Sequence, residues 1–134
     1  MEKAILNLRE VAFAYKKGHP VFNGLNLDIQ AGQITGLLGK NGTGKSTLLY
    51  LMSGLLHAAS GQINFMGESV NKHSAESLSN MFLIPEEFTL PNISIRQYVK
   101  LNAVFYPNFS DEILRSSLND FELEIGRASC RERV

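Results

Sequence analysis

The sequence predicts an α/β fold, with strands in the first half of the chain and helices in the second. Residues 11–15 and 21–29 alternate apolar side chains in the period of a β-strand. A glycine-rich loop at 39–44 separates a short apolar run from a segment whose apolar residues recur at spacings of three and four. That spacing is the period of a helix. The expected order at the centre of the chain is therefore strand, glycine loop, helix.

Turn residues bound the segments that we expect to form strands. Residues 16–20 hold a turn between the first two strands, and residues 30–32 hold the next turn. Two short apolar runs, one before the glycine loop and one before Pro85, are typical of strands buried in a sheet. The expected strands are 11–15, 21–29, 34–38, 62–66 and 81–84.

Helices are expected from the glycine loop onward. The first spans 45–56, where leucines recur with helical spacing. Ser94 and Gln97 have the spacing of a capping box and begin a second helix, which ends before Pro107. Ser110 begins a third helix, because a serine hydroxyl can accept a hydrogen bond from the free N–H groups of a first helical turn.

The composition is that of a globular protein without a dominant charge. Apolar residues make up 44% of the 134 residues and charged residues 19%, which excludes a disordered or fibrous chain. Thirteen basic and thirteen acidic side chains cancel, so no global basic field favours nucleic acid or anionic lipid. The N-terminus lacks the apolar segment of a secretory signal. We expect a cytoplasmic chain that does not bind nucleic acid.

The loop at 39–47 satisfies the pattern G-x-x-x-x-G-K-[ST] of the Walker A phosphate loop. Its place between an expected strand and an expected helix is the context that this pattern requires. The alternative is an ordinary glycine-rich connection with an exposed lysine. The expected phosphate site consists of Gly39, Asn41, Gly42, Thr43, Gly44, Lys45, Ser46 and Thr47.

The residue types of this loop suit a nucleoside triphosphate. Its glycines carry no Cβ, so successive backbone N–H groups can turn towards phosphate oxygens. The N-terminus of the following helix adds the positive end of a helix dipole. Lys45 is expected to reach the β- and γ-phosphates, Ser46 to bind Mg²⁺ and Thr47 to lie near the α-phosphate.

Residues 36–49 resemble the Walker A region of ATP-binding cassette (ABC) ATPases, in which Asn-Gly commonly precedes the final Gly-Lys-Ser-Thr. The resemblance extends over residues 5–121. Residues 11–15 are similar to the family's adenine-stacking loop, and residues 60–67 are similar to the strand and turn that follow the phosphate-loop helix.

The resemblance implies a P-loop NTPase core in residues 1–123, with N-terminal antiparallel strands and a Walker A strand-loop-helix. Residues 87–123 would begin a helical subdomain. The family's signature motif, Walker B strand and switch histidine have no match, and His19, His57 and His73 lie too early to be that histidine. We therefore expect an N-terminal fragment of the domain, truncated before these motifs, which does not turn over ATP by itself.

Three site residues take their roles from the resemblance. Tyr15 would stack on adenine; a strand-end core aromatic is the alternative. Lys45 would act in catalysis. Glu86 stands where the family's Q-loop commonly has glutamine, and its carboxylate could bind Mg²⁺ but would add negative charge near the γ-phosphate. A solvated loop acid is an equal alternative for Glu86.

The function implied by the resemblance is that of an ATP-binding subunit of an ABC transporter. Such a subunit binds ATP and Mg²⁺, pairs with a second ATPase domain, and sits on the inner face of the cell membrane through a membrane-spanning partner. One alternative is a soluble ABC-type ATPase that acts on nucleic acid or ribosomes. Another is a GTPase or small-molecule kinase with the same loop, although no Asn-Lys-x-Asp guanine signature occurs.

Residues 124–134 show no apolar periodicity and do not continue the family pattern. Codons for residues 125–134 can be chosen to resemble a sequencing adapter read in frame. We interpret the segment as a non-native tail that contains the single cysteine, Cys130. The competing interpretation is a basic arm for nucleic acid, but the segment has only three arginines and no aromatic residue.

Overall fold

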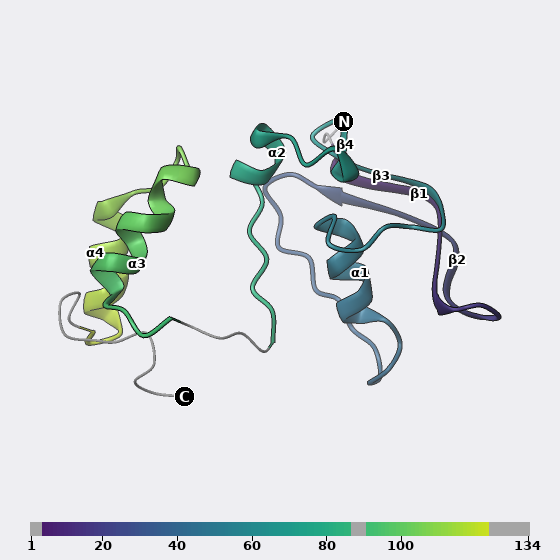
Figure 1. The fold of residues 1–134 in the computed structure, drawn as a ribbon, viewed down its shortest axis with the longest axis horizontal. Helices are drawn as coiled ribbons and strands as arrows, with labels where there is room; N and C mark the ends of the chain where they lie inside the picture. Colours follow the sequence, from purple (N-terminus) through teal and green to yellow (C-terminus); the bar gives the residue numbers. More distant parts are fainter. Residues whose placement is uncertain (1–3, 87–90, 124–134) are drawn as a thin grey trace. The chain divides into compact units, whose positions relative to one another are not determined.

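The computed structural model describes residues 4–86 and 91–123 and divides the chain into two compact units, one ending at Leu83 and one beginning at Ile84. Figure 1 labels the elements along the chain. Residues 87–90 of the expected helical subdomain and the expected tail at 124–134 lie outside the described residues. The first unit contains β1 (Ala4–Lys16), β2 (His19–Gln30), α1 (Lys45–Met52), β3 (Ser60–Phe65), β4 (Glu68–Ser69), a 3-10 helix (Val70–Lys72) and α2 (Ala75–Ser79).

The first unit is built on an antiparallel sheet in the order β2-β1-β3-β4. β1 and β2 form a hairpin, and Gly18 in its turn has a φ of 87°, a conformation that glycine adopts without steric cost. Leu8 of β1 pairs with Leu27 of β2 on one side and with Ile63 of β3 on the other. The strands expected at 11–15, 21–29 and 62–66 are confirmed, and β1 extends further towards the N-terminus than expected.

An irregularity in β1 explains why its first half escaped the sequence pattern. The register shifts between Arg9 and Ala12, and Glu10 has a φ of 49°. The Asn26 side chain on β2 accepts a hydrogen bond from the Glu10 backbone N–H at 3.0 Å and holds this bulge. A bulge adds one residue to a strand, so the alternation of faces changes phase there. As a result, even-numbered residues face the core before the bulge and odd-numbered residues face it afterwards.

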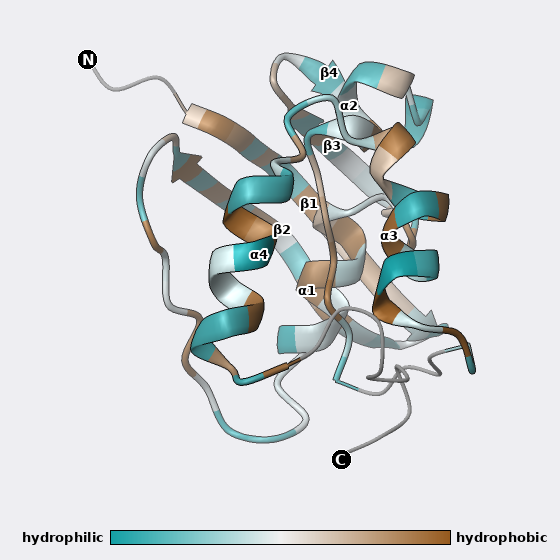
Figure 2. Ribbon diagram, turned by 90° about the vertical axis from the view of Figure 1, so that its left-hand side faces the viewer, coloured by the Kyte–Doolittle hydropathy of each residue, from teal (hydrophilic) through white to brown (hydrophobic). Residues whose placement is uncertain are grey.

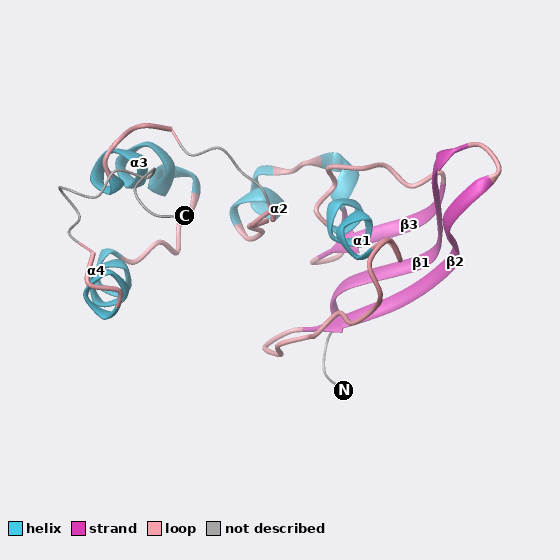
Figure 3. Cartoon of the chain, turned by 90° about the horizontal axis from the view of Figure 1, so that it is seen from below, coloured by secondary structure: helices cyan, strands magenta, loops and turns pink. Residues whose placement is uncertain are grey.

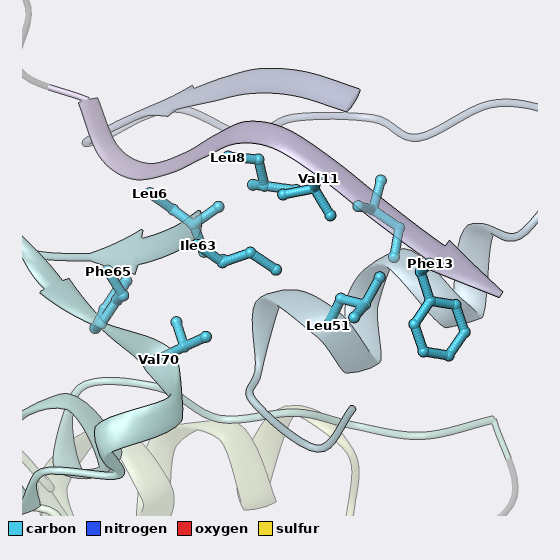
Figure 4. Packing of buried hydrophobic residues seen from close by; sticks show 9 residues of the cluster. Leu6, Leu8, Val11, Phe13, Leu51, Ile63, Phe65 and Val70 are labelled. Carbon is cyan, nitrogen blue, oxygen red and sulfur yellow. The ribbon is translucent and has the colours of Figure 1, made fainter. Parts of the chain in front are cut away.

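The core lies between the sheet and α1, which covers one face of it (Figures 1 and 3). Figure 4 shows side chains from β1, β3, α1 and the 3-10 helix pointing towards one another. Leu8, Val11 and Leu51 are the largest fully buried side chains. The cluster consists of Leu6, Leu8, Val11, Phe13, Leu48, Leu51, Ile63, Phe65 and Val70. Burial of this many apolar side chains is the main stabilising contribution to the first unit.

The helix expected at 45–56 is shorter than predicted. It ends at Met52, because Gly54 takes a φ of 75° and reverses the chain. The Gly54 carbonyl lies 3.2 Å from Nε2 of His73, which follows the 3-10 helix. Leucines with helical spacing therefore continue past the end of the helix itself.

The strands expected at 34–38 and 81–84 are wrong. Neither run belongs to a strand in the structure, and Ile34, Leu38, Phe82 and Ile84 are exposed. An apolar run becomes a buried strand only where neighbouring strands satisfy its backbone groups and cover its side chains. In the part of the chain that the structure describes, the edges of the sheet are β2 and β4, and neither run pairs with them.

The second unit contains α3 (Ile95–Asn102), a 3-10 helix (Ala103–Phe105) and α4 (Asp111–Asp120). The capping box of α3 is confirmed: Ser94 Oγ accepts from the Gln97 N–H at 3.3 Å, and the Gln97 side chain accepts from the Ser94 N–H at 3.1 Å. Ser110 Oγ likewise accepts from the Ile113 N–H at 3.2 Å at the start of α4. Figure 2 shows hydrophobic and hydrophilic bands alternating along both helices. Among the described residues, no helix is both long enough and apolar enough to cross a membrane.

Candidate nucleotide site

The loop at 39–44 leads directly into α1, as the sequence predicted. Gly44 immediately precedes the helix with a φ of 92°. A Cβ at this position would lie 2.6 Å from Cγ1 of Val21 and 3.1 Å from Cζ of Phe22, both on β2. Gly44 is thus required for its backbone conformation and for the close approach of the loop to the sheet. This contact fixes the start of α1 against β2.

Lys45 folds back over the loop that precedes it. Its Nζ donates hydrogen bonds to the carbonyl oxygens of Gly39, at 2.8 Å, and Lys40, at 2.9 Å. The Lys40 carbonyl also accepts a bond from Thr43 Oγ1 at 2.8 Å. An ammonium has three donors, and in this arrangement two of them hold the loop closed around the positive charge.

The N-terminus of α1 offers donors and positive potential. No side chain caps the helix, because the residue at the N-cap position is Gly44, and the first turn contains no acidic residue. The early N–H groups of a helix have no partner within the helix, and the aligned peptide dipoles add partial positive charge at this end. Lys45 adds a full charge at the same place. Ser46 is exposed in the first turn, whereas Thr47 is buried.

Tyr15 lies near the end of β1 and reaches the first turn of α1. Its hydroxyl is 3.0 Å from Thr47 Oγ1, and its ring meets the Phe13 ring edge-on at a centroid distance of 4.9 Å. The Tyr15 side chain is 62% exposed, so it is not a core aromatic. The structure thus brings together the residue expected to contact the base and the loop expected to contact the phosphates.

The family model described as ABC transporter matches residues 22–129, which include the whole loop and α1. The chain belongs to the ABC transporter family. The resemblance drawn from residues 36–49 and the α/β P-loop fold class are confirmed by this match and by related structures.

Similar ABC transporter proteins are between 27% and 34% identical to this chain over the aligned residues. The energy-coupling factor transporter ATP-binding protein EcfA2 of Clostridium perfringens is 34% identical over 119 residues, which are 84% of this chain and 41% of EcfA2. The lipoprotein-releasing system ATP-binding protein LolD of Wigglesworthia glossinidia brevipalpis is 30% identical over 131 residues, 91% of this chain and 57% of LolD.

A solved structure has a similar fold. It is that of cbiO1 from Clostridium perfringens, described as part of the ABC transporter complex cbiONQ. The match has a TM-score of 0.68 and 27% identity, and it covers 92% of this chain and 52% of cbiO1. This ABC transporter chain therefore spans less than two thirds of the length of each of these three relatives.

Two expected site residues take no part in the hydrogen bonds described above. Asn41 is exposed within the loop. Glu86 is exposed and belongs to the second unit. Their expected roles in this ABC transporter chain remain predictions.

Sequence reasoning missed two contributors to the site. Val21 and Phe22 of β2 set the position of Gly44, and they gave no signal because their alternation indicated only a strand. The bond between Tyr15 and Thr47 joins residues 32 positions apart in the sequence. In the sequence, Tyr15 and Thr47 belong to different motifs, and neither motif indicates that the two side chains meet.

Proposed function

We propose that this chain is the N-terminal part of an ATP-binding subunit of an ABC transporter, which binds MgATP through residues 39–47. The observation that carries the proposal is the position of Lys45. Its ammonium lies against the loop carbonyls of Gly39 and Lys40, at the start of a helix without an acidic residue in its first turn. This arrangement gathers donors and positive charge in one place, which supports an anion site over an ordinary connection with an exposed lysine.

The donor set of the loop fits a triphosphate. Lys45 can exchange its bonds to the two neutral carbonyls for bonds to phosphate oxygens, in which donor and acceptor carry opposite charges. Gly42, with a φ of 81°, and Gly44 keep the backbone N–H groups of the loop clear of side chains. The positive end of α1 favours the same negative charge.

A magnesium ion would be held by few protein atoms. Mg²⁺ prefers oxygen ligands and commonly binds through one or two side chains, together with phosphate oxygens and water. The exposed Ser46 hydroxyl in the first turn of α1 is such a ligand. Glu86, the second magnesium ligand that the resemblance implies, belongs to the second unit, and its role stays a prediction. When bound, the ion neutralises part of the phosphate charge.

The base subsite would be the exposed ring of Tyr15. Aromatic side chains stack on any base, because every base has a π-face. The edge-on contact with Phe13 leaves the Tyr15 side chain 62% exposed, so it offers surface for such stacking. This assigns adenine to Tyr15 and the phosphates to residues 39–47, with the two groups of residues joined by the bond to Thr47.

The complete protein would hydrolyse ATP to drive a membrane-spanning partner, as a dimer of ATPase domains on the cytoplasmic face of the membrane. Support comes from relatives whose names describe ATP-binding proteins of transport and release systems. In this assignment residues 1–123 belong to the ATPase domain, residues 87–123 begin its helical subdomain, and residues 124–134 are non-native. Residues 39–47 supply binding groups but no base or water-orienting group, so turnover by this chain alone is not expected.

Isothermal titration calorimetry with MgATP tests the proposal. Lys45→Ala should weaken binding by about 10- to 100-fold, because one charged donor to the phosphates is lost. Lys40→Ala is the matched control: it removes a lysine from the same loop, but only the Lys40 carbonyl, which the variant keeps, takes part in the observed bonds. Equal affinities of the wild type and Lys45→Ala would overturn the proposal.

A further inference from the structure

A single hydrogen bond connects the two halves of the proposed nucleotide site. The Tyr15 hydroxyl near the end of β1 and the Thr47 hydroxyl in the first turn of α1 are 3.0 Å apart. The ring of Tyr15 also contacts the Phe13 ring, with an angle of 88° between the two planes. One edge contact and one hydrogen bond therefore hold a ring that is otherwise open to solvent.

The two partners of this bond differ in their freedom. Thr47 is only 6% exposed and belongs to α1, whose leucines Leu48 and Leu51 pack in the core. Tyr15, by contrast, is 62% exposed. Thr47 is thus the fixed member of the pair, and Tyr15 is the member whose rotamers the bond restricts.

We propose that Thr47 is a positioning residue for base recognition, and that it acts by holding the Tyr15 ring in its stacking orientation through this hydrogen bond. The inference rests on the proposed function. Ordering a free side chain on binding costs conformational entropy, and a ring that is already held avoids part of that cost. The Thr47 hydroxyl therefore contributes to affinity for the base as well as for the phosphates.

The chemistry of the two hydroxyls allows both contributions together. Either hydroxyl can donate in the bond that the structure shows. A phosphate oxygen only accepts, so Thr47 can serve the α-phosphate only by donating its own hydrogen. Tyr15 must then donate to Thr47 Oγ1 when nucleotide is bound. Thr47 thus uses a lone pair towards Tyr15 and its hydrogen towards the phosphate, so its bond to the phosphate is kept when the Tyr15 hydroxyl is removed.

A double-mutant cycle with two ligands tests this inference. Affinities for MgATP and for inorganic triphosphate with magnesium are measured in the wild type, Tyr15→Phe, Thr47→Val and the double variant. Tyr15→Phe should weaken MgATP binding by about three- to tenfold in the wild-type background, because a ring that is no longer held must be ordered on binding. In the Thr47→Val background it should change nothing. Triphosphate carries no base, so Tyr15→Phe should not alter its affinity in either background.

Thr47→Ser supplies the conservative control, because it keeps the hydroxyl that Thr47→Val removes. The effect of Tyr15→Phe on MgATP should return in the Thr47→Ser background. Thermal unfolding without ligand checks that each variant folds. An equal effect of Tyr15→Phe in both the wild-type and Thr47→Val backgrounds would overturn the inference, as would an effect on triphosphate or no effect on MgATP in the wild type.

Failure of the proposed function gives a different result. In that case the wild type would bind neither ligand, or Lys45→Ala would bind both as well as the wild type. If binding depends on Lys45 but the effects of Tyr15→Phe and Thr47→Val are additive, the nucleotide site is supported. Only the role of Thr47 is then refuted.

Discussion

The β1–β2 hairpin and the run at 34–38 are both rich in apolar residues, yet they differ in burial and in strand pairing. Leu8 in β1 is 0% exposed, whereas Leu38 in the run is 95% exposed. β1 has a paired strand on each side, and residues 34–38 belong to no strand. The same contrast separates β3 from the run at 81–84. Apolar content alone therefore does not distinguish the two outcomes.

The difference lies in where the partner strand is found. β1 and β2 are joined by a two-residue turn, so their pairing closes a very short loop at small entropic cost. The runs at 34–38 and 81–84 have no adjacent antiparallel neighbour in the described part of the chain. A short apolar run is typical of a strand covered on both faces, and covering it requires elements from elsewhere in a protein. The pattern predicts a tendency to form a strand, but pairing decides whether a strand forms.

This contrast extends into the nucleotide site. The C-terminal side of the loop is fixed by the paired region, through the approach of Gly44 to Val21 and Phe22 and through the bond between Tyr15 and Thr47. The N-terminal side follows the exposed run. The positions of Gly44, Tyr15 and Thr47 thus depend on the sheet, whereas residues 34–38, directly before Gly39, do not pair with it.

The sharpest test of the comparison pairs Leu8→Ala with Leu38→Ala. Leu8→Ala should lower the free energy of unfolding by about 2–5 kcal/mol, because it leaves a cavity between β1 and α1. Leu38→Ala should change it by less than about 0.5 kcal/mol, because the side chain is exposed. Urea unfolding followed by circular dichroism measures both values. Similar losses in the two variants would show that residues 34–38 are packed in solution.

Gly44→Ala should lower the free energy of unfolding by about 1–3 kcal/mol, because its Cβ would overlap Val21 on β2. Gly42→Ala is the matched control. Gly42 also has a positive φ, but a Cβ there would meet no atom within 4 Å. Gly42→Ala should therefore lower the free energy of unfolding by only about 1 kcal/mol, the cost of the strained backbone. If both variants lose the same stability without nucleotide, contact with the sheet does not fix the loop.

Tyr15→Ala should weaken MgATP binding by about 1–3 kcal/mol, the usual contribution of a stacked aromatic ring. From the sequence alone, Tyr15→Phe would bind like the wild type, because the ring is kept. The bond to Thr47 changes that expectation to a smaller but measurable loss. Calorimetry on the two variants separates the ring from the hydroxyl. Wild-type affinity in Tyr15→Ala would assign Tyr15 a purely structural role.

Deletion of residues 124–134 should have the smallest effect, with no change in melting temperature or in affinity for MgATP. The segment has no periodicity that could bury apolar surface. The family match nevertheless extends to residue 129, so the experiment is informative. A fall of several degrees on deletion would show that these residues pack against the domain.

The sequence by itself determined the features that depend on local chemistry. The Walker A pattern located the loop at 39–47, and the capping serines located α3 and α4, because a cap and its helix lie within a few residues of each other. The hairpin was predictable for the same reason, since its turn adjoins both strands. The family followed from the order and spacing of such motifs.

Tertiary structure decided what depends on residues far apart in the chain. The bulge at Glu10 changes the face that β1 presents, and it depends on Asn26 across the sheet, so the alternation pattern found only the second half of the strand. Likewise, the contact of Gly44 with Val21 and the bond of Thr47 to Tyr15 form only when the sheet and α1 come together. Such contacts are set by packing between elements, which the period of a single segment does not encode.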